Sequence, residues 1–132
     1  MKRIPLFSQL SDDLLKRLAN EFVVITMDPN KIIFEENAIG DNFYIIARGS
    51  VAISKADHDH ENKIVSVLET GDFFGEIALL FSSTRTARAT TREACTFLVM
   101  YRTQFVAFLK QIDAPLRDKI MATAKQRKDQ SH

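Results

Sequence analysis

Short apolar and β-branched runs, separated by polar turn residues, fill the middle of the chain between residues 22 and 101. The runs recur about every 8–12 residues, and no long helical period lies between them. Many short strands at this spacing favour an antiparallel sandwich or roll over a parallel α/β sheet. The pattern predicts a mainly β domain with strands in seven segments: FVVITM (22–27), KIIFE (31–35), FYIIA (43–47), SVAIS (50–54), KIVSVL (63–68), TARATT (86–91) and CTFLVMY (95–101).

Helical periodicity replaces this pattern at the start of the chain and once inside it. Ser11 is a favourable N-cap residue, and the leucines after it fall on one helical face. Residues 1–21 are therefore predicted to form an N-terminal helical segment. Within the β region, EIALLF (76–81) follows Gly75 and predicts one or two turns of helix inserted between strands.

Two further helices are predicted after the last strand, over residues 103–128. Thr103 is the expected N-cap of the first helix. Asp113 is the expected N-cap of the second, with Pro115 in its first turn, where a missing N–H costs little. The apolar stripe of the second helix is predicted to contain Leu116, Ile120, Met121 and Ala124.

The composition is that of one folded domain. The 132 residues are 45% hydrophobic and show no internal repeat or linker, so residues 1–132 are predicted to form a single domain around a β-roll at 22–101. A formal net charge of +1 argues against recruitment of nucleic acid or membranes by bulk charge. The single cysteine fits a reducing compartment. Because the net charge is close to zero, any anion site is expected to be local.

Candidate chemistry is concentrated in residues 71–90, GDFFGEIALLFSSTRTARAT. Gly75 lies directly before the short helix, and its missing Cβ lets a ligand approach the backbone closely. The first free N–H groups of that helix, around Ile77 and Ala78, are expected to form a small anion site. This segment is therefore the predicted binding site.

Arg85 is the residue in this segment that points most directly to an anion. In the predicted strand it alternates with Ala87 and Ala89 on an inward face. A buried guanidinium needs a counter-anion, and a phosphate offsets its desolvation through bidentate hydrogen bonds. Glu76, acceptor-only when ionised, suits a hydroxyl-bearing group such as a ribose. The same residues also permit an internal Arg85–Glu76 salt bridge, which would make the domain a non-binding interaction module.

The whole pattern resembles the cyclic nucleotide-binding domain family over nearly the entire chain. The resemblance rests on the hairpin IGDNFYIIARGSVAI and on the phosphate-binding cassette at residues 73–88, carried by FGEIALLFSSTRTARA. It implies an eight-stranded antiparallel β-roll, or jelly roll, with an opening helical motif and two closing helices. It also implies cAMP or cGMP as the ligand, with no cofactor and no catalytic residues.

The resemblance assigns an expected role to each site residue. Arg85 is expected to pair with the cyclic phosphate, and Glu76 to accept a hydrogen bond from the ribose 2′-hydroxyl. Thr86 is expected near the phosphate and the guanine amino group. The backbone contacts to the phosphate and ribose are expected from Gly75, Ile77 and Ala78. The base pocket is expected to be lined by Ile53, Ser66, Leu68, Phe74 and Lys128.

Three positions bear on how closely the chain follows the family pattern. Asn37 stands where the family usually has Gly, and because Asn tolerates a left-handed backbone the turn is expected to be kept. Ser66 falls at a commonly apolar position near the base. Lys128 aligns with a cationic residue that closes over the base in some bacterial channel members. Alternatively, KQRK (125–128) is a solvated helix end whose charge complements the helix dipole.

Within the family, the opening IPLFSQLSDDLLKRLAN and the short basic final helix look most like the C-terminal domain of a prokaryotic cyclic nucleotide-gated potassium channel. The expected partner is then a tetrameric transmembrane pore domain, with this domain on the cytoplasmic side of the membrane. Ligand binding is expected to move the C-terminal helix. About 30 residues follow the last strand, too few for a helix-turn-helix, so no nucleic-acid partner is expected. A kinase or exchange-factor module and a stand-alone sensor are the alternatives.

The remaining candidate residues have simpler interpretations. His58 and His60 have a spacing that permits a metal site, but the polar stretch around them favours an exposed hairpin loop, and no metal is expected. Cys95 begins an apolar strand and is predicted to be a small core residue.

Overall fold

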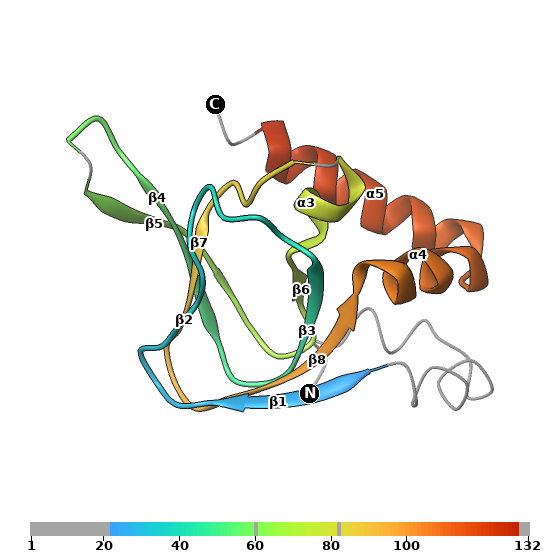
Figure 1. Cartoon of the computed structure of the whole chain (residues 1–132), viewed down its shortest axis with the longest axis horizontal. Helices are drawn as coiled ribbons and strands as arrows, with labels where there is room; N and C mark the ends of the chain where they lie inside the picture. Colours follow the sequence, from blue (N-terminus) through green and yellow to red (C-terminus); the bar gives the residue numbers. More distant parts are fainter. Residues whose placement is uncertain (1–21, 60, 82, 130–132) are drawn as a thin grey trace.

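The computed structural model describes residues 22–59, 61–81 and 83–129 of the chain. These residues form two four-stranded sheets, with one short helix between strands and two helices after the last strand (Figure 1). The elements in chain order are β1 (Val23–Met27), β2 (Ile32–Phe34), β3 (Asn42–Arg48), β4 (Val51–Ala56), β5 (Asn62–Leu68), β6 (Phe73–Phe74), α3 (Glu76–Leu80), β7 (Arg88–Thr91), β8 (Cys95–Tyr101), α4 (Arg102–Gln111) and α5 (Ala114–Asp129).

The strands pair as the predicted antiparallel roll, which is confirmed. The order is β1-β8-β3-β6 in the first sheet and β2-β7-β4-β5 in the second. Each of the seven predicted segments overlaps one strand. The eighth strand, β6, has only two residues and lies inside the cassette, where it pairs with β3. An element this short shows no alternation of its own, so only its pairing reveals it.

The first sheet has an apolar cluster on each face, because side chains alternate along its strands. On β3, Phe43 and Ile45 belong to one cluster, and Tyr44 and Ile46 to the other. The outer core lies between the first sheet and the helices: Phe43, Ile45, Phe73, Leu79, Met100, Phe105, Phe108, Ile112, Leu116 and Ile120. The inner core lies between the two sheets: Tyr44, Ile46, Val51, Leu68, Phe74, Ala89, Cys95, Phe97 and Val99.

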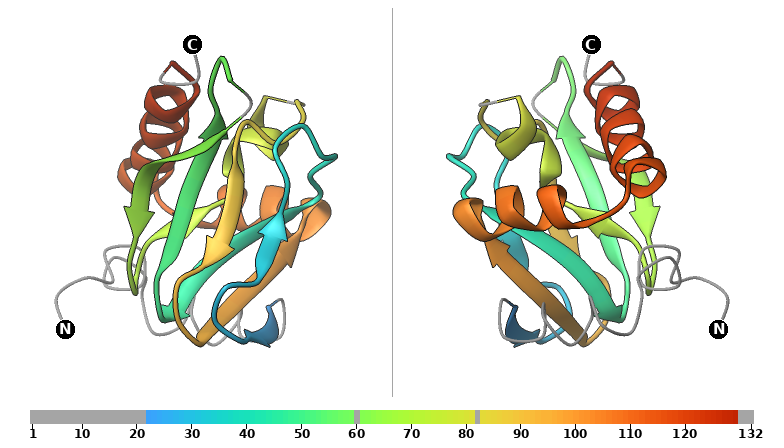
Figure 2. Two further views of the ribbon diagram at one scale, coloured as in Figure 1. Left: turned by 90° about the vertical axis from the view of Figure 1, so that its left-hand side faces the viewer. Right: turned by 90° about the vertical axis from the view of Figure 1, so that its right-hand side faces the viewer.

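The two C-terminal helices lie across one side of the roll, as the right-hand view of Figure 2 shows. The start of α4 differs from the prediction, because its N-cap is Tyr101 and Thr103 lies inside the first turn. The Tyr101 amide donates to Oε1 of Gln104 at 3.0 Å, so a glutamine side chain satisfies this helix end without a capping hydroxyl. Asp113 caps α5 as predicted, since its Oδ1 accepts a hydrogen bond of 3.1 Å from the Leu116 amide.

The predicted apolar stripe of α5 is correct at three positions and wrong at one. Leu116, Ile120 and Ala124 are buried, whereas Met121 is 40% exposed. The three buried residues follow an i, i+4 spacing and lie on one face. Met121 follows Ile120 directly and is turned from it by about 100° around the helix axis.

Some predictions concern residues that lie outside the described part of the chain, namely the N-terminal helical segment at 1–21 and the side chain of His60. Cys95 is buried in the inner core, as predicted. Among the described helices, none combines the length and apolar character needed to cross a bilayer.

Candidate ligand-binding site

A pocket of about 340 Å³ opens beside α3, between the second sheet and α5. Its volume falls in the range of roughly 300–1,000 Å³ that is usual for small-molecule sites. Three parts of the chain line it. The second sheet contributes Phe34, Ile53, Lys55, Val65, Ser66 and Leu68; the cassette contributes residues 74–78 and 85–87; and α5 contributes Thr123, Gln126 and Arg127.

Arg85 lies in this pocket as a buried cation held by neutral groups. It is 4% exposed, and its Nη1 and Nη2 donate to the carbonyl oxygens of Gly75 (2.8 Å) and Asn42 (2.9 Å). Its Cζ lies 4.1 Å from the centroid of the Phe34 ring. Among the described residues, Nε has no hydrogen-bond partner and no carboxylate forms an ion pair with the guanidinium. Burial lowers the pKa of Arg85, which is the direction expected for a charge without a close counter-ion.

The backbone position of Arg85 differs from the prediction in one respect. Arg85 precedes β7, which begins at Arg88, rather than lying within a strand. Arg85, Ala87 and Ala89 are nevertheless all buried, as the sequence predicted. The backbone of Arg85 is instead held by the loop before β3, because its amide donates to the Ala38 carbonyl at 2.8 Å and its carbonyl accepts from the Asn37 amide at 2.7 Å.

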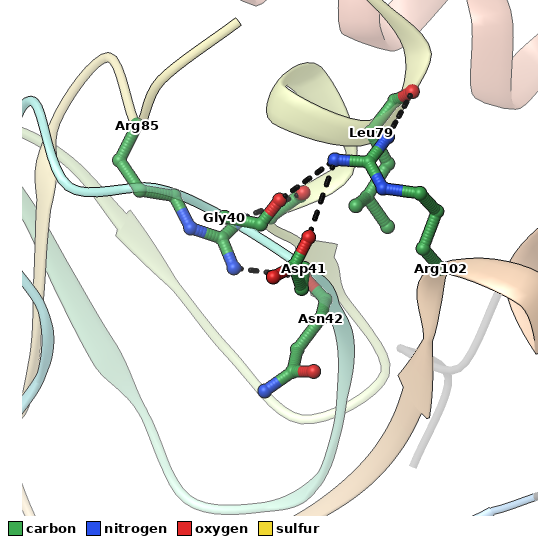
Figure 3. A network of polar contacts seen from close by, with 7 residues as sticks. Gly40, Asp41, Asn42, Leu79, Arg85 and Arg102 are labelled. Atoms are coloured by element: carbon green, nitrogen blue, oxygen red, sulfur yellow. Dashed lines mark hydrogen bonds and ion pairs between the residues drawn. The ribbon is translucent and has the colours of Figure 1, made fainter. Parts of the chain in front are cut away.

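Figure 3 shows how the loop before β3 connects Arg85 to two helices. Arg102, the first residue of α4, donates from Nη2 to the Gly40 carbonyl at 3.0 Å and lies 3.5 Å from Oδ1 of Asp41. Its Nη1 reaches the Leu79 carbonyl of α3 at 3.4 Å. Gly40 packs so closely on Arg85 that an added Cβ would lie 2.5 Å from Nε. The position of Arg85 is therefore linked to both α3 and α4.

Glu76 is the second buried charge, and its partner comes from the last helix. Its carboxylate is 1% exposed, and Oε1 accepts a hydrogen bond of 2.8 Å from Nη1 of Arg127 on α5. The same nitrogen donates to the Phe73 carbonyl at 2.9 Å. Burial raises the pKa of Glu76, although Arg127 and then Arg85 oppose that rise. The alternative of a direct Arg85–Glu76 salt bridge is therefore wrong, because the ion pair of Glu76 is with Arg127.

Two residues in left-handed backbone shape the cassette and the loop beside it. Gly75, the N-cap of α3, has φ of 87°, and a Cβ there would lie 2.9 Å from Arg85 Nη1. Asn37 has φ of 72°, so the turn expected from Asn in place of Gly is kept. The close approach of Gly75 to Arg85 explains why this position needs both a positive φ and no side chain.

The predicted base-pocket residues reach the lining with one exception. Ile53, Ser66 and Leu68 all face the pocket, as does Phe74 of the inner core. Lys128 does not line it, and its Nζ lies 4.4 Å from the centroid of the Phe81 ring instead. On α5 the pocket is lined by Thr123, Gln126 and Arg127.

Arg127 and Lys55 are lining residues that the sequence did not assign to the site. Arg127 and Lys128 are both spaced correctly from Ala124 to continue the buried face of α5. The spacing of seven from Ile120 to Arg127 is the signal that favours Arg127. Lys55 alternates with Ile53 along β4, and this period of two is the signal that could have placed it in the pocket.

The roll, the buried guanidinium of Arg85 and the pocket beside α3 have the form of a small-molecule binding domain. Residues 24–112 match the family model described as the cyclic nucleotide-binding domain, and the chain belongs to this family. The predicted family is confirmed.

The comparisons with individual proteins place similar domains in larger proteins of several kinds. The chain is 31% identical over 116 residues to the cGMP-dependent protein kinase, isozyme 2 forms cD5/T2, of Drosophila melanogaster, covering 86% of this chain and 12% of the kinase. It is 29% identical to the potassium channel AKT1 of Arabidopsis thaliana, covering 83% of this chain and 13% of the channel. The catabolite activator protein of Thermus thermophilus superposes with a TM-score of 0.80 at 25% identity, covering 96% of this chain and 58% of that one.

Proposed function

We propose that the pocket binds a cyclic nucleotide, with its phosphate at Arg85 and its ribose at Glu76. The observation that carries this proposal is the buried guanidinium of Arg85, which forms no ion pair with a described carboxylate. A phosphate supplies the missing negative charge and accepts hydrogen bonds in the geometry that a guanidinium favours. Oε2 of Glu76, buried without a hydrogen-bond partner, is able to accept from a ribose hydroxyl while Oε1 stays paired with Arg127.

The cassette backbone and the sheet complete the proposed binding mode. Gly75, Ile77 and Ala78 contribute backbone beside the phosphate and ribose, and Thr86 contributes its hydroxyl. The base then extends toward the part of the pocket lined by Ile53, Ser66, Leu68 and Phe74. On α5, we propose Arg127 in place of Lys128 as the cationic residue beside the bound ligand, because Arg127 lines the pocket.

We further propose that binding is transmitted by α5. Arg127 connects this helix to Glu76, so the free energy of ligand binding at Glu76 is coupled to the position of α5. The ligand shifts the population toward the arrangement of α5 that it binds more tightly, by no more than the difference in its affinity for the two arrangements. Leu116 and Ile120, which pack in the outer core, are the residues that exchange partners as α5 moves.

The attached effector is proposed to be the tetrameric pore of a cyclic nucleotide-gated potassium channel at the cytoplasmic side of a membrane. The likeness to the plant potassium channel supports this proposal. A regulatory module of a kinase is a second candidate of equal weight, and the likeness to the fly kinase favours it. The coding sequence upstream of Met1 separates the two, because a channel requires a pair of pore helices there and a kinase module does not.

Calorimetric titration of the chain with cAMP and with cGMP tests the binding proposal. Replacement of Arg85 by leucine is expected to weaken binding by about 2–5 kcal/mol, on the order of 30- to 4,000-fold in Kd, because it removes one partner of a buried charge pair. The matched control is R88L, since Arg88 lies three residues further on, is outside the pocket lining and pairs with Glu35 at a partly exposed site. R88L should leave Kd within about twofold.

Two results would contradict the binding proposal. Absence of heat at millimolar cAMP and cGMP would show that the pocket does not serve these ligands. An R85L variant that keeps both its fold, judged by circular dichroism, and its affinity would place the phosphate elsewhere.

A further inference from the structure

Lys55 brings a positive charge to the end of the pocket farthest along the second sheet. On β4 it alternates with Val51 and Ile53, whose side chains face the inner core and the pocket. Lys55 and Val65 of the adjacent β5 line the same pocket as Ile53. The register shift between Ile53 and Ser54 is what lets the bulged Val65 face the pocket together with Ser66.

The ammonium group of Lys55 has unused donor capacity. It is half-buried, and within the described residues it forms no hydrogen bond and no ion pair. Glu36 is the acidic group that acts on it, but Oε1 of Glu36 accepts a hydrogen bond of 3.0 Å from the Ala56 amide. Burial lowers the pKa of Lys55 and Glu36 opposes this, as expected for a cation that has lost water without gaining a close partner.

The neutral polar side chains that line the pocket cannot replace a cation. Ser66 presents a hydroxyl, Thr123 another, and Gln126 an amide, and each of these both donates and accepts. The remaining lining cations are engaged: Arg85 with two carbonyls and Arg127 with Glu76. Lys55 is therefore the donor-only group that a base placed here would meet.

We propose that Lys55 reads the acceptor edge of a guanine, so that the pocket prefers cGMP to cAMP. This inference rests on the proposed function, which places the base at this end of the pocket. Guanine presents two adjacent acceptors, N7 and O6, on one edge, and lysine is a common partner of that pair. Adenine presents N7 beside the donor N6 amino group, which opposes the hydrogens of an ammonium.

Three nucleotides separate this contact from the others in the pocket. Cyclic IMP keeps N7 and O6 of guanine but lacks the 2-amino group that Thr86 is expected to contact. If Lys55 sets the preference, the wild-type chain binds cGMP and cIMP about five- to tenfold more tightly than cAMP. If cIMP instead binds as weakly as cAMP, the preference arises from the 2-amino group and the proposal is overturned.

The matching variant is K55M, which keeps the aliphatic stem and removes the ammonium. Its expected effect is a loss of about five- to tenfold in affinity for cGMP and cIMP, with cAMP changed by less than about twofold. The control is K63M, because Lys63 pairs with Lys55 in the β-sheet register but is outside the pocket lining and 66% exposed. K63M should leave all three affinities unchanged.

The outcomes distinguish this inference from the function on which it rests. Equal affinity of the wild type for the three nucleotides, or an equal loss for all three in K55M, overturns the role of Lys55 and leaves nucleotide binding intact. Absence of binding by all three overturns both. If K55M does not fold, the wild-type series with cIMP still decides the question.

Discussion

The two cores of this domain share the strands β3 and β8 but differ in what they enclose. The outer core is apolar throughout. At its centre Phe43, Phe105 and Phe108 are fully buried, and the ring centroids of Phe43 and Phe105 lie 4.5 Å apart. The inner core is apolar between the sheets but opens at one end into the pocket. There the chain buries two charged side chains, Glu76 and Arg85.

The outer core contains residues that stabilise the domain, whereas the pocket contains buried polar atoms that remain able to bind a ligand. In the outer core every buried side chain has apolar neighbours, so burial is favourable on both sides of each contact. In the pocket, Nε of Arg85 and Oε2 of Glu76 are buried without hydrogen-bond partners in the described residues, which costs stability. We infer that this cost is offset when a ligand with a phosphate and a hydroxyl group binds.

The largest expected effect on stability comes from the outer core. Phe105→Ala should lower the free energy of unfolding by about 3–5 kcal/mol, because it removes a fully buried ring and leaves a cavity. Urea denaturation followed by circular dichroism measures the change. The neighbouring Val106→Ala, at an exposed position, should stay within about 0.5 kcal/mol.

The same Phe105→Ala variant tests whether the two regions are separable. Under conditions where it is folded, its Kd for cAMP or cGMP should stay within about threefold of the wild type, since Phe105 does not line the pocket. A large loss of affinity in the folded variant would contradict the division between the two regions.

A smaller effect, directed at the pocket, is expected from Gly40→Ala. The new Cβ would lie 2.5 Å from Nε of Arg85 and 2.8 Å from Cβ of Ala78, so the guanidinium or α3 must shift. Such overpacking costs about 1–3 kcal/mol of stability. Because the displaced group is Arg85, affinity for the nucleotide should fall by about tenfold or more, which calorimetry measures.

The control for Gly40→Ala is Ile39→Ala at the adjacent position. Ile39 is 84% exposed, so its replacement should change neither stability nor affinity appreciably. If Gly40→Ala keeps the wild-type Kd, Arg85 is free to move without loss of binding and is not fixed by the loop before β3.

The sequence predicted those parts of the fold that depend on local patterns. The strands follow from alternation, the cap at Asp113 from side-chain chemistry, and the left-handed turn at Asn37 from backbone preference. The predictions failed where contacts with other residues determine the local structure. Gln104 caps α4 from inside the helix and displaces Thr103 from that role. Met121 is left exposed because it lies about 100° around α5 from the buried Ile120.

The candidate site shows the same division. Gly75, Glu76 and Arg85 lie within eleven residues of sequence, so one motif was enough to place them together. Arg127 and Lys55 come from α5 and β4, and only tertiary packing brings them to the pocket. The ion pair of Glu76 with Arg127 could not be predicted, because it depends on which residue of α5 faces the cassette.

The smallest expected effect is a pH dependence that only the pocket should show. Burial raises the pKa of Glu76 above its ordinary value of 4.5. Between the pKa of the unfolded chain and the higher pKa of the folded chain, the folded state therefore binds more protons than the unfolded state. The free energy of unfolding therefore gains a contribution that decreases as pH rises through this window, with a slope of at most about 1.4 kcal/mol per pH unit. Glu76→Gln removes this contribution.

Urea denaturation of the wild type and of Glu76→Gln at a series of pH values from 4 upward measures the effect, because the stability difference between them should change in favour of the variant as pH rises. The matched series with Phe105→Ala should give a difference from the wild type that does not vary with pH, since the outer core contains no titratable group. A pH-independent difference for Glu76→Gln would mean that Arg127 fully compensates the desolvation of the carboxylate. In that case burial of the Glu76 carboxylate would not destabilise the folded domain, and the pocket would not differ from the outer core in this respect.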